Sequence, residues 1–355
     1  MASLLTQSKI PKYLQLAEQL RAQIASGELA PEARLPTVAQ IQAQLGVSQS
    51  TVDKAYALLE QEGLIVREQG RGTFVAHPAP AVAVRSLGLW MRIPATTDFY
   101  MMEVLAGVRE EASRRDLQLI WLDDAKPLHS SEVGGVILSC EPNEAMALGV
   151  PPGMPHVLLF HHSPDFTCVV ADDFQVGKLA TRHLIEQGHR RIACLLSSDF
   201  DSISRRRLAG YQEAMQEAGL EAEPEAVRFL GGRLERGYRH CAAAVMQDWL
   251  ETQWHQAGFT GLVTQNDETA AGVINACSAV GLQVPGDVSI VGCDGTALSE
   301  LVVPALTTVK IPLRELGSKA VEALDKGMTG KGLSQWPKVV LPVELLQRES
   351  TRSLK

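Results

Sequence analysis

RLPTVAQIQAQLGVSQSTVDKAYALLEQEGLIVREQGRGTFV, residues 34–75, decides the N-terminal fold, because its pattern predicts two short helices at a tight turn and then a hairpin. Thr37 is placed to cap the first helix, which repeats apolar residues at helical spacing, and Gly46 is placed to end it. Ser48 should cap the second helix, and Gly63 should stop it. Two helices at a tight turn are typical of proteins that insert a helix into a DNA groove.

The residues after the second helix predict two strands, 64–66 and 73–75, joined by the glycine-rich turn 69–72. The second helix begins with exposed, short polar side chains that suit base edges or phosphates. They are Gln49, Ser50, Asp53 and Lys54. These features indicate a DNA-binding unit; a small helical bundle that binds protein is the alternative.

Several separate motifs closely resemble the winged helix-turn-helix of the GntR family of bacterial transcription regulators, over roughly residues 10–76. The matching residues are Leu35-Pro36, LGVS (45–48), TV (51–52), KAY (54–56), LEQEGLI (59–65) and GRGTFV (70–75). The resemblance implies a surface for operator DNA on the second helix, its cap and the tip of the wing. That surface would consist of Arg34, Thr37, Ser48, Gln49, Ser50, Thr51, Asp53, Lys54, Gly70, Arg71 and Gly72.

The sequence departs from this family at three positions where arginine is common, because Ala39, Gln49 and Asp53 stand there. None of the three can make the bidentate arginine contact to guanine, although Gln49 can pair with adenine and Asp53 can accept from cytosine. Residues 1–77 contain seven Lys/Arg and seven Asp/Glu, so one copy should bind DNA weakly. We therefore expect a homodimer that joins two half-sites, with phosphates held by the remaining cations. These are Arg34, Lys54, Arg67, Arg71, Lys9 and Lys12.

Composition predicts a soluble protein of two or three globular domains, with 355 residues of which 45% are hydrophobic and 21% charged. The six cysteines form no C-x-x-C pair, which favours free thiols in a reducing cytoplasm. No apolar run approaches 18 residues and the N-terminus has no apolar signal segment, so we expect neither export nor membrane insertion. The net charge of −8 lies entirely beyond residue 77, which excludes a basic coat there.

Prolines at 78 and 80 mark a short, semi-rigid linker, and beyond it strands alternate with helices. The predicted strands are 86–93, 117–122, 135–138, 157–160, 167–170, 191–196, 227–230, 261–264, 288–293, 307–309 and 338–343. The predicted helices are 99–114, 175–187, 205–218, 237–251, 268–280 and 313–326, the first with a stripe of Met102, Leu105, Val108 and Ala112. This alternation predicts α/β architecture with parallel sheets covered on both faces, and its length favours two doubly wound lobes.

Four long motifs in this part are similar to the effector domain of the lactose/galactose repressor family, a relative of periplasmic sugar-binding proteins. They are IEQGHRRIACL (185–195), RRRLAGYQEAMQEAGL (205–220), NDETAAGVINACSAVGLQVPGDVSIVGCDG (266–295) and PALTTVKIPLRELGSKAVEAL (304–324). The segment 123–133 is shorter than is usual in that family, so a helix of the first lobe is expected to be truncated or lost. The chain thus resembles arabinose-responsive repressors, which join a GntR-type DNA-binding domain, here called the reader, to a periplasmic-binding-protein-like domain.

The two resemblances predict an α+β winged helix-turn-helix DNA-binding domain at 1–77, a linker at 78–84, and a two-lobed effector-binding and dimerisation domain at 85–350. The second resemblance places the effector at the carboxyl ends of the strands, between the lobes. Its contacts would be Phe99, Tyr100, Asp173, Arg207, Asn266 and Asp294. Arg207 would bind two sugar hydroxyls, and Asp294 would accept hydrogen bonds from two.

Several of these residues also have a structural interpretation. Asp173 and Asp267 can act as helix N-caps, and we leave Asp267 out of the site for that reason. Arg207 can be a surface residue, Asn266 and Asp294 can fix loops, and Phe99 or Tyr100 can belong to the core.

Trp90 and Trp121 lie mid-strand and are expected in the core. His161 and His162 suggest a metal pair, but adjacent strand residues point to opposite faces, so we expect neither a metal site nor a cofactor.

No catalytic motif is recognisable in the chain, so an enzyme is not expected. We predict a cytoplasmic, homodimeric, ligand-responsive transcription regulator, a repressor whose operator binding is altered by a sugar or sugar-like effector. The alternative is a sugar-sensing interaction protein with a decayed DNA reader. The effector, with purines among the possibilities, the operator sequence and the sign of the response stay open at this point.

Overall fold

The computed structural model describes residues 11–25, 28–30, 32–61, 64–68, 71–76, 86–91, 99–122, 133–151, 153–231, 237–329 and 338–355. The chain divides into two compact units, Met1–Ala83 and Val84–Lys355. Several expected features lie outside the described residues, namely Lys9, Gly63, Gly70, the linker 78–84 and the shortened segment up to residue 132.

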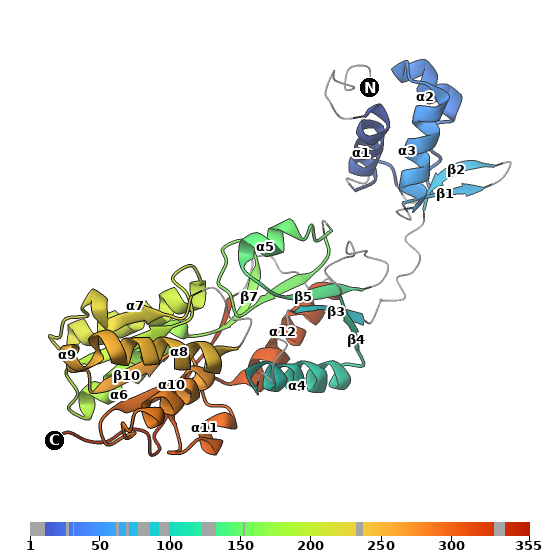
Figure 1. Ribbon diagram of the computed structural model, residues 1–355. Helices are drawn as coiled ribbons and strands as arrows, with labels where there is room; N and C mark the ends of the chain where they lie inside the picture. Colours follow the sequence, from blue (N-terminus) through green and yellow to red (C-terminus); the bar gives the residue numbers. More distant parts are fainter. Residues whose placement is uncertain are drawn as a thin grey trace. The chain divides into compact units, whose positions relative to one another are not determined.

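The described elements of the N-terminal unit are α1 (Lys12–Ala25), α2 (Val38–Leu45), α3 (Gln49–Gln61), β1 (Ile65–Glu68) and β2 (Gly72–Val75) (Figure 1). The helix α1 was not predicted from the sequence, and it packs along α3. Buried residues of all three helices and of the hairpin form one core, in which Tyr56 donates a hydrogen bond to the carbonyl oxygen of Pro36. This core fixes α3 against the rest of the unit.

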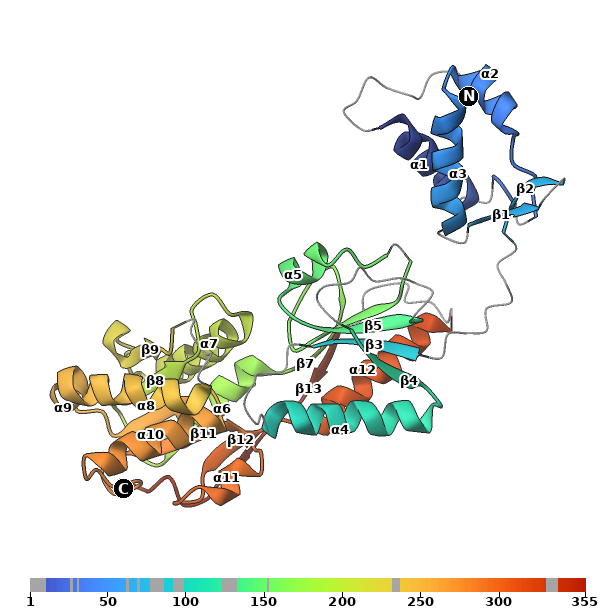
Figure 2. The same cartoon turned by 45° about the vertical axis from the view of Figure 1, so that its right-hand side comes forward.

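The C-terminal unit contains two six-stranded sheets, each covered by helices, which we call lobe 1 and lobe 2 (Figure 2). The sheet of lobe 1 is parallel throughout, in the order β13-β7-β6-β5-β3-β4. Its strands are β3 (Ser86–Met91), β4 (Gln118–Trp121), β5 (Gly135–Ser139), β6 (His156–Leu159), β7 (Thr167–Ala171) and β13 (Lys338–Leu341). The helices α4 (Phe99–Arg114) and α12 (Leu313–Met328) pack side by side on one face, and α5 (Pro142–Ala147) lies on the other.

The sheet of lobe 2 has the order β14-β12-β11-β10-β8-β9 and is parallel except for the edge strand β14. Its strands are β8 (Ile192–Leu196), β9 (Val227–Phe229), β10 (Gly261–Thr264), β11 (Ser289–Asp294), β12 (Thr307–Lys310) and β14 (Glu344–Leu346). The helices α6 (Asp173–Glu186) and α7 (Ser202–Glu217) pack on each other over one face, and α8 (Tyr238–Trp249) and α10 (Asp267–Ala279) pack over the other. The short helix α11 (Leu298–Leu301) follows β11.

The chain passes between the lobes three times. It leaves lobe 1 after β7, returns after β12, and leaves again between β13 and β14. A hydrogen bond from Asp172 N to Leu341 O at 3.1 Å joins the first crossing to the third, and one from Ile311 N to Asp294 O at 3.0 Å joins the second crossing to the end of β11. Three short connections of this kind allow the lobes to turn about a common hinge.

The predicted winged helix-turn-helix followed by a two-lobed α/β domain is confirmed, with three local corrections. Residues 338–343 were predicted as one strand, but the chain crosses at Pro342, so β13 joins lobe 1 and β14 joins lobe 2. Trp121 was expected in the core and is 49% exposed, because β4 is an edge strand. Met102 was placed on the buried stripe of α4 and is 60% exposed, because Met101, Val104 and Val108 face the sheet instead.

Candidate functional site

A cavity of about 190 Å³ lies between the two lobes, at the carboxyl ends of strands from both sheets. We call it the strand-end cavity. Lobe 1 contributes Phe99, Tyr100, Met101, Ser139 and Phe160 to its lining. Lobe 2 contributes Ile203, Arg207, Tyr238, Gln265, Asn266, Asp267, Glu268, Asp294 and Thr296. This is the place where open α/β sheets bind their ligands.

An aromatic wall comes from lobe 1. Phe99 and Tyr100 form the first turn of α4, and Phe160 follows β6. The rings of Tyr100 and Phe160 meet edge to face, with centroids 5.3 Å apart and an interplanar angle of 63°. An apolar face opposite polar groups is the usual composition of a small-molecule site, in which a few polar groups fix the orientation of the ligand.

A buried ion pair supports the polar side of the cavity. Arg207 Nε donates to Asp173 Oδ1 at 3.0 Å, and the two side chains are only 6% and 4% exposed. A second nitrogen, Nη1, donates to the carbonyl oxygen of Gln265. Burial alone would lower the pKa of the guanidinium, but the charge of Asp173 holds this pKa above its ordinary value.

Nε and one of the two N–H groups of Nη1 are therefore already bonded to the protein, so a fork to two ligand hydroxyls would have to use Nη2 and the remaining N–H of Nη1. Asp173 does not line the cavity and lies behind Arg207. It is not the N-cap of α6 either, because Asp172 fills that position and accepts from Gln175 N at 3.2 Å.

Asn266 and Asp267, which follow β10, fix the floor of the cavity. Asn266 caps α10, and its Oδ1 accepts from the nitrogen and the hydroxyl of Thr269 at 2.8 and 2.7 Å. Asp267 accepts from Thr296 N at 2.8 Å and from the hydroxyls of Thr296 and Thr308 at 3.0 and 2.6 Å. Burial raises the pKa of Asp267 to about 6, against the opposing effect of these hydrogen bonds. Asp267 thus ties α10 to the loop after β11.

Two cavity residues have unusual backbone conformations. Phe160 has φ 76° and Asp294 has φ 117°, a region that residues other than glycine rarely adopt. Each lies at the carboxyl end of a strand, and each is buried. Backbone strain of this kind costs on the order of 1–3 kcal/mol and collects at functional sites, so it supports a binding role for this edge of the sheets.

Five of the six expected effector contacts meet in this cavity, namely Phe99, Tyr100, Arg207, Asn266 and Asp294. Sequence reasoning missed Gln265, Glu268, Thr296, Tyr238, Phe160 and Ser139, and it set Asp267 aside. Residues 265–268 directly follow a predicted strand. The rule that ligands bind at the carboxyl ends of strands could therefore have identified them from the sequence. A larger groove of about 790 Å³ shares Phe99 and Glu268 but is lined mainly from α8, α10 and α11.

In the N-terminal unit, three expected DNA contacts also build the helix ends. Thr37 and Gln40 form a reciprocal capping box, with Thr37 N donating to Gln40 Oε1 at 2.7 Å and Gln40 N to Thr37 Oγ1 at 3.3 Å. Ser48 Oγ accepts from Thr51 N at 3.3 Å and lies 2.9 Å from Thr51 Oγ1. Gln49, Ser50 and Lys54 are exposed, whereas Asp53 is half-buried. The first turns of α3 therefore present an open polar face.

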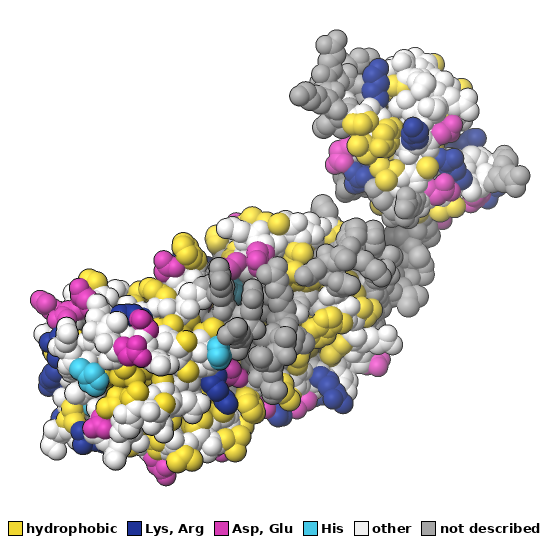
Figure 3. Space-filling view, viewed as in Figure 1, with side chains coloured by type: hydrophobic (Ala, Val, Ile, Leu, Met, Phe, Trp, Pro, Cys, Tyr) yellow, Lys and Arg dark blue, Asp and Glu magenta, His cyan; other side chains and the backbone are white. Residues whose placement is uncertain are grey.

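Acidic residues accompany the cations of the N-terminal unit. Arg71 pairs with Glu68, and Arg67 Nε lies 3.2 Å from Glu60 Oε2. On the face in view in Figure 3, basic and acidic side chains are interspersed over this unit. The unit therefore lacks a single basic face in this view, as its formal neutrality predicts.

The wing brings Arg34 beside the hairpin. Leu35 N donates to Thr73 O at 2.8 Å, and Arg34 forms a bridge to Phe74, so this segment runs along β2. Gly72 has φ 127°, and a Cβ there would lie 2.9 Å from Arg34 Nε, so a side chain at position 72 would displace Arg34. Gly70, the other glycine expected at the tip, lies outside the described residues.

Comparison with known proteins identifies both units. Residues 12–75 match the family of bacterial regulatory proteins called gntR, and residues 181–351 match the periplasmic binding protein-like domain. The chain combines a GntR-family DNA-binding domain with a periplasmic-binding-protein-like domain. The gntR match lies within the first compact unit, and the second match covers residues 181–351 of the second compact unit, which we call the effector unit.

Several known transcription regulators are similar to this chain over most of their own length. The chain is 28% identical to the arabinose metabolism transcriptional repressor of Geobacillus stearothermophilus, over 97% of this chain and 99% of that protein. It is 29% identical to the ribose operon repressor of Escherichia coli K12, over 77% and 86%. A LacI family transcriptional regulator from Mycobacterium smegmatis, at 28% identity, superposes with a TM-score of 0.63 over 75% of this chain and 98% of that one.

These relatives are transcriptional regulators, which places the chain with regulators rather than with enzymes. Among the described residues, no helix combines the length and the apolar character that a membrane span requires.

Proposed function

We propose that this protein is a cytoplasmic, homodimeric transcriptional repressor whose operator binding changes when a small neutral sugar occupies the strand-end cavity. The observation that carries the proposal is the convergence of an aromatic wall with charged and amide groups from two lobes in that cavity. Two relatives are named as repressors of arabinose metabolism and of the ribose operon, which supports the same effector class.

The size and charge of the strand-end cavity narrow the effector class. Its volume, about 190 Å³, is below the range of roughly 300–1,000 Å³ of typical ligand pockets, which favours one sugar ring over a disaccharide. Among the described residues that line it, three carry carboxyl groups, Asp267, Glu268 and Asp294, and one is an arginine, Arg207, which Asp173 neutralises. An anionic effector would meet net repulsion there, so sugar acids and sugar phosphates are disfavoured.

Homodimer formation is supported by the weak charge of the reader and by exposed apolar side chains on the effector unit. Met102, Leu301 and Val303 are exposed, Val303 at 86%. Met102 lies on α4, and the other two lie at or after α11. Two readers held by one dimer act at high effective concentration on adjacent half-sites, which compensates for weak single contacts.

The effector assignment is tested by a thermal-shift screen of the full chain against pentoses, hexoses, sugar acids and purine nucleosides. A true effector at 100 times its Kd stabilises by about 2.7 kcal/mol. Asp294→Asn should lower its affinity at least tenfold, because a hydrogen bond to a charged group contributes about 1.5–3 kcal/mol. Asparagine tolerates the positive φ of this position, so the fold should survive.

Asp248→Asn, which changes an exposed carboxylate on α8 outside the cavity, is the matched control and should bind as wild type does. An effector that binds Asp294→Asn and wild type with the same affinity in calorimetry contradicts the assigned cavity. Thermal stabilisation by purine nucleosides but not by sugars would show that the effector is a purine and not a sugar.

DNA binding is tested by the salt dependence of operator affinity. Arg71→Ala and Lys54→Ala should each reduce the slope of log K against log salt by about one unit, because each cation is expected to neutralise one phosphate. The Arg71–Glu68 pair does not prevent this, since exposed ion pairs contribute little.

Arg21→Ala is the matched control, because Arg21 likewise pairs with the glutamate three residues before it, Glu18, but lies on α1. Its slope should stay at the wild-type value. If neither Arg71→Ala nor Lys54→Ala changes the slope, or if the protein binds no DNA, the alternative of a sugar-sensing interaction protein with a decayed DNA reader is favoured.

A further inference from the structure

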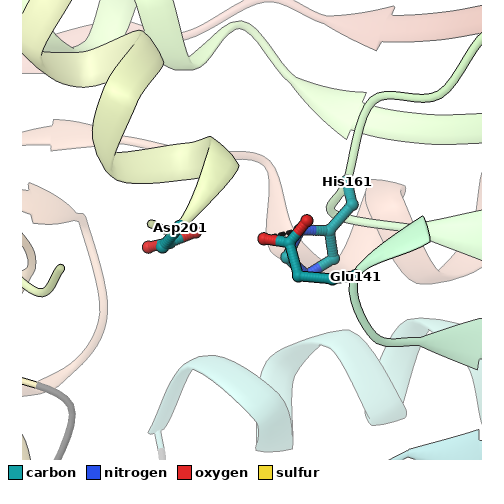
Figure 4. Close-up of side chains that lie close together, drawn as sticks. All are labelled: Glu141, His161 and Asp201. Carbon is teal, nitrogen blue, oxygen red and sulfur yellow. Dashed lines mark ion pairs between the residues drawn. The ribbon is translucent and has the colours of Figure 1, made fainter. Parts of the chain in front are cut away.

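Three side chains with metal-binding atoms meet where the two lobes face each other beside the start of α7. Glu141 follows β5 and His161 follows β6, both in lobe 1, whereas Asp201 is the N-cap of α7 in lobe 2. One imidazole nitrogen and two carboxylate oxygens from these residues all lie within 4.8 Å of one another. Figure 4 shows Glu141 and His161 side by side, with Asp201 across from them at the end of the α7 ribbon.

The contacts between Glu141 and His161 already require a cation or a proton between them. His161 Nδ1 lies 3.2 Å from Glu141 Oε1 and 3.0 Å from Ser202 Oγ. Glu141 Oε1 also accepts from Ser202 N at 3.1 Å and from Ser202 Oγ at 3.2 Å. An imidazole lone pair and a carboxylate lone pair repel each other at this distance unless a proton or a metal ion lies between them.

Each carboxylate has coordination capacity left. Within the part of the chain that the structure describes, Glu141 Oε2 accepts no hydrogen bond. Asp201 accepts from Ile203 N at 2.9 Å and from the hydroxyls of Ser197 and Ser204 at 2.9 and 2.8 Å. These bonds use three of roughly four lone-pair positions of the carboxylate and leave one.

We propose that Glu141, His161 and Asp201 form a binding site for a divalent transition-metal ion that links lobe 1 to lobe 2. One imidazole and two carboxylates suit an ion such as Zn²⁺. Ligands about 2.1 Å from a tetrahedral ion are about 3.4 Å apart, so these atoms must approach by roughly 1 Å. The three-stranded hinge between the lobes supplies a movement of this kind.

The site is separate from the strand-end cavity, because none of its three residues lines that cavity. Its neighbours Ser139 and Ile203 do line it, so an ion bridging the lobes would hold them together beside the effector. His162, the other half of the histidine pair in the sequence, takes no part in the cluster. The proposed partners of His161 are thus Glu141 in the same lobe and Asp201 across the lobe boundary, rather than its neighbour in sequence.

Isothermal titration of the tag-free full chain with Zn²⁺, and with Co²⁺ for its visible absorption, tests the proposal without effector or DNA, so its result does not depend on the proposed function. Wild-type protein should bind one ion with a micromolar Kd. His161→Gln and Glu141→Gln should each weaken binding at least 30-fold, while His255→Gln, at an exposed histidine, should not change it.

Asp201→Asn should leave the fold intact, because asparagine also caps helices. It should still weaken metal binding, because asparagine is a poorer metal ligand than aspartate. It should retain the wild-type circular dichroism spectrum and bind the ion at least tenfold more weakly. Binding that is only millimolar in wild type, or that is equal in His161→Gln, Asp201→Asn and His255→Gln, overturns the proposal.

Discussion

Replacing Arg207 by methionine is expected to lower the free energy of unfolding of the effector unit by about 3–5 kcal/mol, because it leaves the carboxylate of Asp173 buried without its partner. Both side chains are almost fully enclosed, and Arg207 also donates to the carbonyl oxygen of Gln265, which loses this donor. Urea unfolding of the full chain, followed by tryptophan fluorescence, measures the change, since most of the tryptophans lie in the described effector unit.

The double variant Asp173→Asn/Arg207→Met provides the control, because it removes both charges. It should be more stable than Arg207→Met alone, since an uncompensated buried charge is more costly than an apolar pair. Equal stability of the single and double variants would show that the ion pair does not hold α6 to α7. Arg207 variants are consequently poor probes of effector contact, and Asp294→Asn is the cleaner test.

Gly177→Ala is expected to destabilise the effector unit by about 1–3 kcal/mol, although alanine is the better helix former. A Cβ at Gly177 on α6 would overlap the carbonyl oxygen of Arg207 on α7, and a Cβ at Gly210 would overlap that of Phe174. The two backbones are therefore in direct contact, and the helices must separate to admit one methyl group. Thermal unfolding measures the loss, and effector affinity should fall with it, because α7 carries Arg207.

The sign of the stability change in Gly177→Ala shows whether α6 and α7 are in close contact at this position. In a helix without close packing, Gly→Ala stabilises by up to roughly 1 kcal/mol. Ala209→Gly, at an exposed position of α7, is the control and should cost about that amount. A Gly177→Ala protein more stable than wild type would mean that α6 and α7 do not approach as closely as the structure places them.

The strand-end residues could be predicted because one rule of parallel sheets is sufficient to place them. Asn266 and Asp294 each come at or just after the end of a hydrophobic strand, and Arg207 lies in a motif shared with a known family. Their bonding could not be predicted in the same way. That Arg207 gives two nitrogens to Asp173 and Gln265 depends on how closely α6 crosses α7, which no local pattern contains.

The incorrect predictions of burial also depend on how the elements pack, which the local sequence does not specify. Met102 and Met101 are equally apolar, and only the direction from which the sheet approaches α4 decides which is buried. Trp121 is exposed because its strand ended up at an edge, a property of strand order rather than of sequence. The contacts of His161 could not be predicted either, because Glu141 follows another strand and Ser202 lies in the other lobe.

The late crossing at Pro342 has a consequence for the order in which the protein matures on the ribosome. The described elements of the reader end at residue 75, so this part can fold early in synthesis. Neither sheet of the effector unit is complete until β13 and β14 have emerged, and Ser350 and Thr351 after them are buried, with Ser350 Oγ donating to Ile290 O at 2.6 Å. A nascent chain therefore acquires its DNA-reading part long before it can sense anything, and shortening its last segments would disable sensing while leaving that part intact.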